Sequence, residues 1–238
     1  PVIDGLASEV FRTPGYPVFL AIAGDLRVAL LLQCLLSSVT VVLVYLLGIR
    51  FRLPKSVATI AALILALHPA DILSANVILT ETLFSFLLVV SVLTYLSRQT
   101  GYSGLLLASA TLVRPVSLFM GILMPLFGKA GLKSKLKFGA LCLIPVLCWS
   151  FRNYSEGKGF RISSVPAINS LYYTGAYIEI AKRGGDSYAD WPDAVANLHE
   201  ELKGVLAPGE DVIDTISRLG IARVFENPAL YLTVISKS

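Results

Sequence analysis

The stretch Val77-Ile78-Leu79-Thr80-Glu81-Thr82-Leu83-Phe84 opens an apolar run that continues to Tyr95-Leu96, and Glu81 is its only carboxylate. A run of about 20 apolar residues, rising 1.5 Å per residue, can cross the hydrocarbon core of a membrane as a helix. An ionisable group inside such a helix costs at least about 2.5 kcal/mol unless it faces a cavity or a partner. We therefore expect Glu81 to be either functional or paired, and we favour a functional role.

Composition sets the class of protein. The 238 residues are 55% hydrophobic and 15% charged, with a mean hydropathy of +0.72, whereas soluble domains carry about 25% charged residues. These values predict an all-α polytopic membrane protein. The net charge of +4 fits loop lysines and arginines that follow the positive-inside rule. Because no basic run is interleaved with aromatic residues, nucleic acid is not an expected partner.

The cysteines and the chain ends give two further expectations. Cys34, Cys142 and Cys148 lie in apolar runs without CxxC spacing or a nearby histidine pattern, so we expect packing roles and no metal site. The chain begins at Pro1 without methionine or a signal peptide and ends on an apolar segment. We therefore expect an internal part of a longer protein.

The N-terminal part of the chain predicts a rigid turn followed by a membrane helix. Pro14 and Pro17 cannot continue a helix, and a short interfacial helix then leads into a span at about 28–47. Arg50, Arg52 and Lys55 follow at once and mark the cytoplasmic end of that span, which places the turn on the outer face. Arg12 in the turn is either an interfacial snorkelling residue or a cation held over a membrane cavity.

Arg114-Pro115 interrupts the apolar run 105–127 near its middle. If this run were one straight span, the cluster Lys129, Lys133, Lys135 and Lys137 would face away from the Arg50 cluster, against the positive-inside rule. Two short helices that meet at Arg114-Pro115 place both clusters inside, and proline is a common break in membrane helices. The alternative is a single kinked span with a snorkelling Arg114.

Composition changes sharply after the next apolar run, 138–148, and its aromatic, cationic end. Eleven of the sixteen carboxylates lie beyond residue 155. We therefore expect transmembrane helices over 1–154, an outer-face soluble helical segment over 155–227, and the start of a further membrane helix at 228–238. Polar helices are expected near 192–206 and 210–226. His68, beside a proline, is expected to cap a helix or lie at an interface rather than serve a site.

Taken in order, several short motifs resemble those of the C-type membrane glycosyltransferases (GT-C). They are Arg12-Thr-Pro-Gly-Tyr-Pro, Leu79-Thr-Glu-Thr-Leu-Phe, Leu112-Val-Arg-Pro, Trp149 with Arg152-Asn-Tyr, and a strand-like Ile162-Ser-Ser. The chain is most similar to the bacterial dolichyl-phosphate-mannose-protein mannosyltransferase-like and 4-amino-4-deoxy-arabinose-transferase-like families. The resemblance covers essentially the whole chain and implies a GT-C helical bundle.

The same resemblance implies an activity and a site. A sugar would pass, with inversion, from a polyprenyl-phosphate carrier to a lipid, protein or glycan acceptor on the outer face of a bacterial inner membrane. Glu81 matches an acidic catalytic position, and the residues implied to bind substrate are Arg12, Tyr16, Arg114, Arg152 and Asn153. The family's principal aspartate lies on a first helix that this chain lacks, so we expect that base upstream and a fragment without full activity.

The residue types suit this chemistry. Arginines supply bidentate contacts to a phosphate leaving group, and a carboxylate can serve as base or hold an acceptor. Glu81 would hold the acceptor or fix an arginine. No cofactor or metal is expected, although some members of the wider superfamily use a divalent ion. The alternatives are a transporter or flippase of lipid-linked sugars, for which we find no inverted repeat, and a structural membrane subunit.

Overall fold

The computed structural model describes residues 11–128, 130–185, 188–207 and 209–237, and every regular element in these ranges is helical. The chain divides into two compact units. The apolar unit comprises residues 13–154, and the polar unit comprises the N-terminal residues up to Arg12 together with residues 155–238. The division after Tyr154 coincides with the change in composition on which the sequence analysis placed a boundary.

The apolar unit begins with a short helix and then the longest helix of the chain. Its helices are α1 (Gly15–Ala23), α2 (Leu26–Arg50), α3 (Lys55–Leu67), α4 (Pro69–Ala75), α5 (Glu81–Leu96), α6 (Thr100–Val113), the 3-10 helix Pro115–Phe119, α7 (Met120–Phe127) and α8 (Leu132–Ser155). Asp25 caps α2 by accepting hydrogen bonds from the N–H groups of Arg27 and Val28. The expected short helix is α1, which includes Pro17 in its first turn, where the missing N–H of a proline is tolerated, so Pro17 does not prevent the helix, contrary to expectation. The expected span 28–47 lies within α2, a helix long and apolar enough to cross a membrane.

Two helices, α2 and α8, are long and apolar enough to span a membrane, and the pair α3 and α4 would make a third if it is one broken span, bent by 56°. Only 11% of the most apolar window of α2 is buried within the structure, and Leu31, Leu35 and Val42 point outward on it. An apolar face of this size is typical of a surface that contacts lipid. The remaining apolar helices are shorter than a span.

Residues Thr100 to Phe127 form a hairpin. A Cβ atom on Gly104, in α6, would lie 2.6 Å from the carbonyl oxygen of Phe138, near the start of α8. At the far end of the hairpin, a Cβ atom on Gly128 would meet the ring of Tyr95, which ends α5 just before α6 begins. The chain therefore leaves the Tyr95 level in α6, reverses at Arg114-Pro115 and returns in α7. The two-helix prediction is confirmed, and the single kinked span is wrong.

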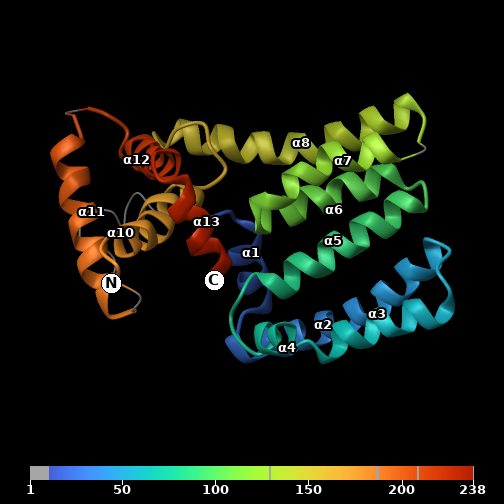
Figure 1. The fold of residues 1–238 in the computed structure, drawn as a ribbon. Helices are drawn as coiled ribbons and strands as arrows, with labels where there is room; N and C mark the ends of the chain where they lie inside the picture. The colour runs from blue at the N-terminus through green and yellow to red at the C-terminus, as the bar shows by residue number, and fades with distance from the viewer. Residues whose placement is uncertain (1–10, 129, 186–187, 208, 238) are drawn as a thin grey trace. The chain divides into compact units, whose positions relative to one another are not determined.

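With this hairpin the helices of the apolar unit alternate in direction (Figure 1). We call the end where α2 and α5 begin and α6 ends the Glu81 end, and the opposite end the basic end. Arg50 Nη2 donates to the carbonyl of Leu96 at 2.9 Å, which joins the last turns of α2 and α5 at the basic end. Lys137 covers Gly101 at the start of α6, so the lysine cluster lies at the same end as the arginine cluster.

The polar unit is a small helical domain with its own core. Its elements are α9 (Val165–Ile168), the π-helix Asn169–Gly175, α10 (Ala176–Lys182), the 3-10 helix Tyr188–Asp190, α11 (Trp191–Val205), α12 (Val212–Glu226) and α13 (Pro228–Lys237). Leu171, Leu198 and Ile216 are among its fully buried side chains. The predicted helices near 192–206 and 210–226 are confirmed as α11 and α12.

One expectation for this unit needs correction. Within the described residues Ile162–Ser164 is not a strand. The Ser164 N–H donates to the Phe11 carbonyl at 3.2 Å, and the Phe11 N–H donates to the side-chain oxygen of Ser164 at 2.9 Å. The helix α13 packs against α10 and α12 within the polar unit, and the start of a further membrane helix at 228–238 stays a prediction.

The hairpin predicts the membrane sidedness of two exposed loop positions. In a cysteine-free background, Gln99→Cys and Gly131→Cys should react with a membrane-impermeant thiol reagent from the same side, because α6 and α7 together do not cross. Both positions are exposed, and no atom lies within 4 Å of a Cβ built on Gly131. Labelling of the two cysteines from opposite faces would contradict the hairpin.

Candidate functional site

The candidate site lies at the Glu81 end of the apolar unit, where α5 begins. Glu81 is the first residue of α5, and a carboxylate in the first turn interacts favourably with the helix dipole. Thr80 Oγ1 donates to Glu81 Oε2 at 3.2 Å, which helps to fix the carboxylate. The sequence run that predicted one long helix from Val77 thus breaks at Thr80, and the break leaves Glu81 at a helix end rather than in a helix interior.

Arg114 reaches the same end from α6. Its backbone is extended (φ −140°, ψ 115°), the conformation that a following proline favours. Its N–H donates to the Ala110 carbonyl at 2.8 Å, and its carbonyl accepts from both the N–H and the Oγ of Ser117 at 3.3 Å. Thr111 Oγ1 and Ser117 Oγ are 2.9 Å apart. The reversal is therefore closed by hydrogen bonds within the chain, as a turn in apolar surroundings requires.

Glu81 and Arg114 form an ion pair. Arg114 Nη1 lies 2.7 Å from Glu81 Oε1, and the two side chains are 40% and 39% exposed. The Arg114 guanidinium also lies over the Phe84 ring, 5.8 Å from its centroid. Of the two roles that the sequence left open, holding an acceptor or fixing an arginine, the ion pair is the contact expected for the second; the roles themselves stay predictions.

The start of α1 packs against the end of α6, just before Arg114. Thr13 Oγ1 donates to the Val113 carbonyl at 3.0 Å, and a Cβ atom on Gly15 would lie 2.7 Å from the Leu112 carbonyl oxygen. Glycine is needed at position 15 because the two backbones approach so closely. Tyr16, Leu83 and Val113 share one buried cluster. Three motifs far apart in the sequence therefore meet at the Glu81 end.

The Tyr16 side chain is buried and is held by a hydrogen bond within the apolar unit. It is 8% exposed, and its hydroxyl donates to Gln33 Oε1 at 2.5 Å. Gln33 is fully buried, and its Nε2 donates to the carbonyls of Ser74 at 3.2 Å and Val77 at 2.8 Å. The amide thus connects α2, α1 and the loop before α5. These contacts favour a positioning role for Tyr16, and its predicted part in substrate binding stays a prediction.

The other predicted binding residues are Arg12, Arg152 and Asn153. Arg12 is an exposed residue of the polar unit, and no hydrogen bond or ion pair within the described residues involves its side chain. Arg152 Nη1 donates to Asn153 Oδ1 at 3.2 Å and lies over the Trp149 ring at 4.9 Å. Asn153 is fully buried, which indicates packing at the end of α8. His68 Nδ1 lies 2.8 Å from Asp71 Oδ2 beside the bend between α3 and α4.

A small polar cavity lies in the apolar unit below Glu81. Its lining residues are Ser37, Thr40, Leu65, Asp71, Thr82 and Ser85, and its volume for the centres of water molecules is about 20 Å³. This is room for a water molecule and too little for a sugar ring. In the part of the chain that the structure describes, no group of three His, Cys, Asp or Glu side chains is placed to hold a metal ion.

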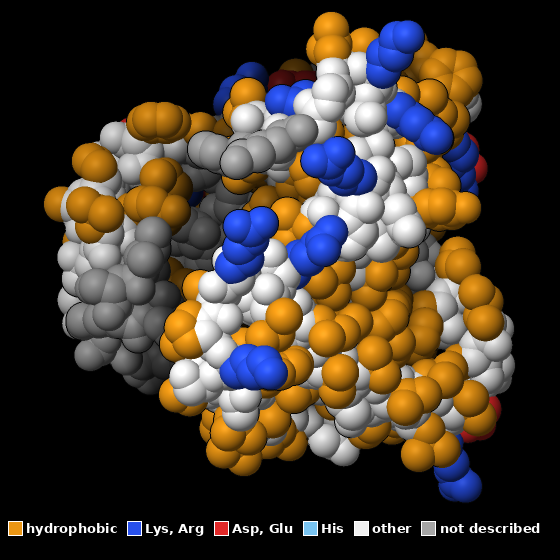
Figure 2. Space-filling model, turned by 90° about the vertical axis from the view of Figure 1, so that its right-hand side faces the viewer, with side chains coloured by type: hydrophobic (Ala, Val, Ile, Leu, Met, Phe, Trp, Pro, Cys, Tyr) orange, Lys and Arg blue, Asp and Glu red, His pale blue; other side chains and the backbone are white. Residues whose placement is uncertain are grey.

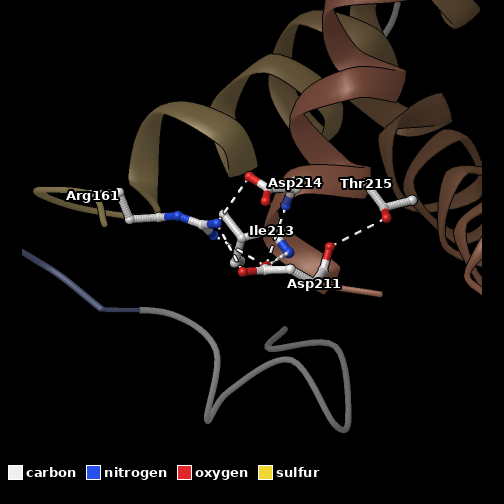
Figure 3. Close-up of polar contacts among 5 residues, drawn as sticks. All are labelled: Arg161, Asp211, Ile213, Asp214 and Thr215. Carbon is white, nitrogen blue, oxygen red and sulfur yellow. Dashed lines mark hydrogen bonds and ion pairs between the residues drawn. The ribbon is translucent and has the colours of Figure 1, made fainter. Parts of the chain in front are cut away.

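The polar unit contains a second charged group, centred on Arg161 (Figure 3). Arg161 Nη1 and Nη2 contact the two carboxylate oxygens of Asp211 at 3.1 and 2.8 Å, and Nη2 also contacts Asp214 at 2.9 Å. Asp211 caps α12 through the N–H of Ile213 at 2.8 Å. Burial raises the pKa of Asp211, but hydrogen bonds from Arg161 and from this N–H outweigh that effect, and the net pKa lies below the usual range of an aspartate. The group fixes the 156–164 loop to α12.

A largely buried arginine connects three helices of the same unit. Arg223 of α12 is 13% exposed, with Nη1 3.0 Å from Glu179 Oε2 of α10 and Nη2 paired with Glu201 of α11. Burial raises the pKa of Glu179, and hydrogen bonds from Arg183 and charge from Arg223 lower it below the usual range. These contacts give the carboxylates beyond residue 155 that take part in them a structural role, because they pair with an arginine of another helix.

Sequence reasoning missed Gln33 and the Arg161 group. Gln33 carried a detectable signal, because it is the single amide in the apolar run 28–47, and a polar side chain in such a run is expected to have partners. Arg161 and Asp211 are 50 residues apart, and nothing in their spacing indicates that they meet.

Comparison of the chain with protein-family models, with curated proteins and with solved structures finds no match to any of them.

The Asp211 pair predicts an acid-sensitive polar unit. Because folding lowers the pKa of Asp211, the pair stabilises the fold fully above about pH 4 and loses this contribution as the pH falls. Wild type should therefore lose stability more steeply on acidification than Arg161→Gln, followed through Trp191 fluorescence in a Trp149→Phe background. Lys182→Gln, which removes an exposed charge, should keep the wild-type slope. Equal slopes in wild type and Arg161→Gln would contradict the role of the pair.

Proposed function

We propose that this chain acts in glycosyl transfer at a membrane, where it holds the phosphate of a polyprenyl-phosphate-linked sugar and passes the sugar to a lipid, protein or glycan acceptor on the outer face. The observation that carries the proposal is the Arg114 guanidinium at the exposed Glu81 end. Its fixed backbone, its ion pair with Glu81 and its partial exposure together present a preoriented cation at the end of an apolar helical unit.

Arg114 has donors left for a ligand. A guanidinium carries five N–H groups, and the described contacts of this side chain use only Nη1. The remaining donors match the planar, bidentate contact that arginine makes to phosphate. Such a contact would stabilise the charge that develops on the leaving phosphate when the bond between its oxygen and the anomeric carbon breaks.

Glu81 is a positioning residue in this proposal. A carboxylate held by an arginine is a weaker base than a free one, because the ion pair favours its ionised form. Its role is then to orient the Arg114 side chain. The negative charge of Glu81, which the dipole of α5 stabilises, balances the positive charge of Arg114 until a donor phosphate binds. The proton of the acceptor hydroxyl would pass to another base as the hydroxyl oxygen attacks the anomeric carbon, with inversion.

A GT-C-like bundle in a bacterial inner membrane belongs to the same proposal. Its supports are the order of the motifs and the hairpin at Arg114-Pro115. A transporter or flippase of lipid-linked sugars would use the same phosphate contact, so binding alone does not separate the two. Their products do: transfer leaves polyprenyl phosphate and a glycosylated acceptor, whereas transport moves the intact donor lipid across the bilayer.

Donor binding tests the proposal directly. With the chain reconstituted in liposomes, Arg114→Gln should weaken binding of a radiolabelled polyprenyl-phosphate sugar by roughly 1.5 to 3 kcal/mol, the usual scale for a hydrogen bond to a charged group. Arg114→Lys should restore part of the affinity, because it keeps the charge and loses the planar fork. Arg27→Gln removes an exposed arginine from the same end and should bind as wild type does.

Two results would overturn the proposal. One is an Arg114→Gln variant that stays folded and binds the donor with wild-type affinity. The other is equal binding of the labelled donor and of the corresponding uncharged polyprenol, since the phosphate is the group that Arg114 is proposed to recognise.

A further inference from the structure

In the apolar unit all the carboxylates lie at the Glu81 end, and the basic end carries cations. Between Thr13 and Tyr154 the sequence holds three carboxylates, Asp25, Asp71 and Glu81, and all three lie at the Glu81 end, where α2 and α5 begin and α3 gives way to α4. The described cations of the basic end are Arg50, Arg52, Lys55, Arg98, Lys133, Lys135 and Lys137. Figure 2 shows this end with blue side chains spread across it.

Two of these arginines occupy backbone positions that favour glycine. Arg52 and Arg98 have φ angles of 60° and 61° and are the two non-glycine residues with positive φ in the described chain. Each follows the C-cap of its helix, and the two helices end in the same hydrogen-bond pattern. In α2, Leu53 N–H donates to the Gly48 carbonyl at 3.1 Å, and in α5, Gln99 N–H donates to the Thr94 carbonyl at 2.9 Å.

This pattern is the Schellman motif, whose left-handed residue is usually glycine. A side chain in that conformation costs roughly 1 to 2 kcal/mol. Arginine at both places is therefore not explained by the backbone, and a strained residue of this kind is a reason to look for a function. Both side chains are exposed, and within the described residues neither makes a hydrogen bond or ion pair.

Exposed apolar side chains surround the same cations. Phe51 and Leu53 flank Arg52 and are 56% and 45% exposed, and Leu132 and Leu136 alternate with the lysines of α8 and are 73% and 64% exposed. Such a mixture fits the boundary between hydrocarbon and headgroups, where apolar side chains enter the lipid and basic ones meet phosphate. A surface for nucleic acid would instead need stacking aromatics or polar side chains beside the cations.

We propose that the basic end is a binding surface for the phosphate headgroups of anionic phospholipids, with Arg52 and Arg98 as its principal contacts. Each basic residue near an anionic membrane surface raises affinity by about fivefold. Binding at the basic end also fixes the orientation of the apolar unit in the membrane, because anionic lipid is enriched in the cytoplasmic leaflet. The surface is at the opposite end from Arg114, so it is independent of the proposed sugar transfer.

The test is a titration of the full chain in detergent micelles with phosphatidylglycerol or phosphatidylcholine, with bound lipid counted by native mass spectrometry. Wild type should prefer phosphatidylglycerol, and Arg52→Gly with Arg98→Gly should lower its affinity for that lipid by about 25-fold, with little change for phosphatidylcholine. Arg52→Lys with Arg98→Lys should keep most of the preference. Arg27→Gln, at the Glu81 end, should keep all of it.

Thermal unfolding separates lipid binding from folding. Because glycine relieves the left-handed strain, the double glycine variant should melt at or above the wild-type temperature while it loses the lipid. Undiminished phosphatidylglycerol binding in that variant would overturn the proposal. Displacement of the lipid by inorganic phosphate at equal concentration, or by short duplex RNA at lower concentration, would also overturn it, because the surface would then recognise a free anion or nucleic acid.

Discussion

The ion pair between Glu81 and Arg114 is the contact on which the Glu81 end of the apolar unit depends. It joins the first residue of α5 to the reversal after α6 at 2.7 Å, in a unit with only two other carboxylates. Both side chains are partly exposed, so loss of the partner costs less than in a protein interior, but it leaves a lone charge at the end of an apolar helix. The pair therefore stabilises the hairpin, which places both basic clusters at the opposite end.

The direction of each long helix thus decides at which end of the apolar unit its charged residues lie. The helices α2 and α5 start at the Glu81 end and finish at or just before an arginine, Arg50 and Arg98. The direction is clearest in α2, which runs from the Asp25 cap to Arg50. The same alternation leaves one end mixed in charge and the other purely cationic. We infer that the two ends meet different chemistry: a bound phosphate at Arg114 and a lipid surface at the basic end.

Much of this arrangement could be predicted from the sequence, because hydropathy and the placement of lysine and arginine act over whole helices. The hairpin followed from the lysines after Arg114-Pro115, since the positive-inside rule places them on the same side as the Arg50 cluster. The contacts of single polar side chains could not be predicted in the same way. Gln33 pairs with Tyr16 and with two carbonyls of a distant loop, and such partners depend on how the helices pack. The left-handed backbone at Arg52 and Arg98 could not be predicted either, because the usual signal for that conformation is a glycine and both positions hold arginine.

A double-mutant cycle on thermal unfolding of the chain in micelles tests the central claim most directly. Glu81→Gln and Arg114→Gln should each destabilise the apolar unit, and the double variant should be more stable than the sum of the two losses predicts, by on the order of 1 kcal/mol. The singles leave an unpaired charge that the double variant lacks. Losses that add to within about 0.3 kcal/mol would show that the two side chains do not interact, and would contradict the account.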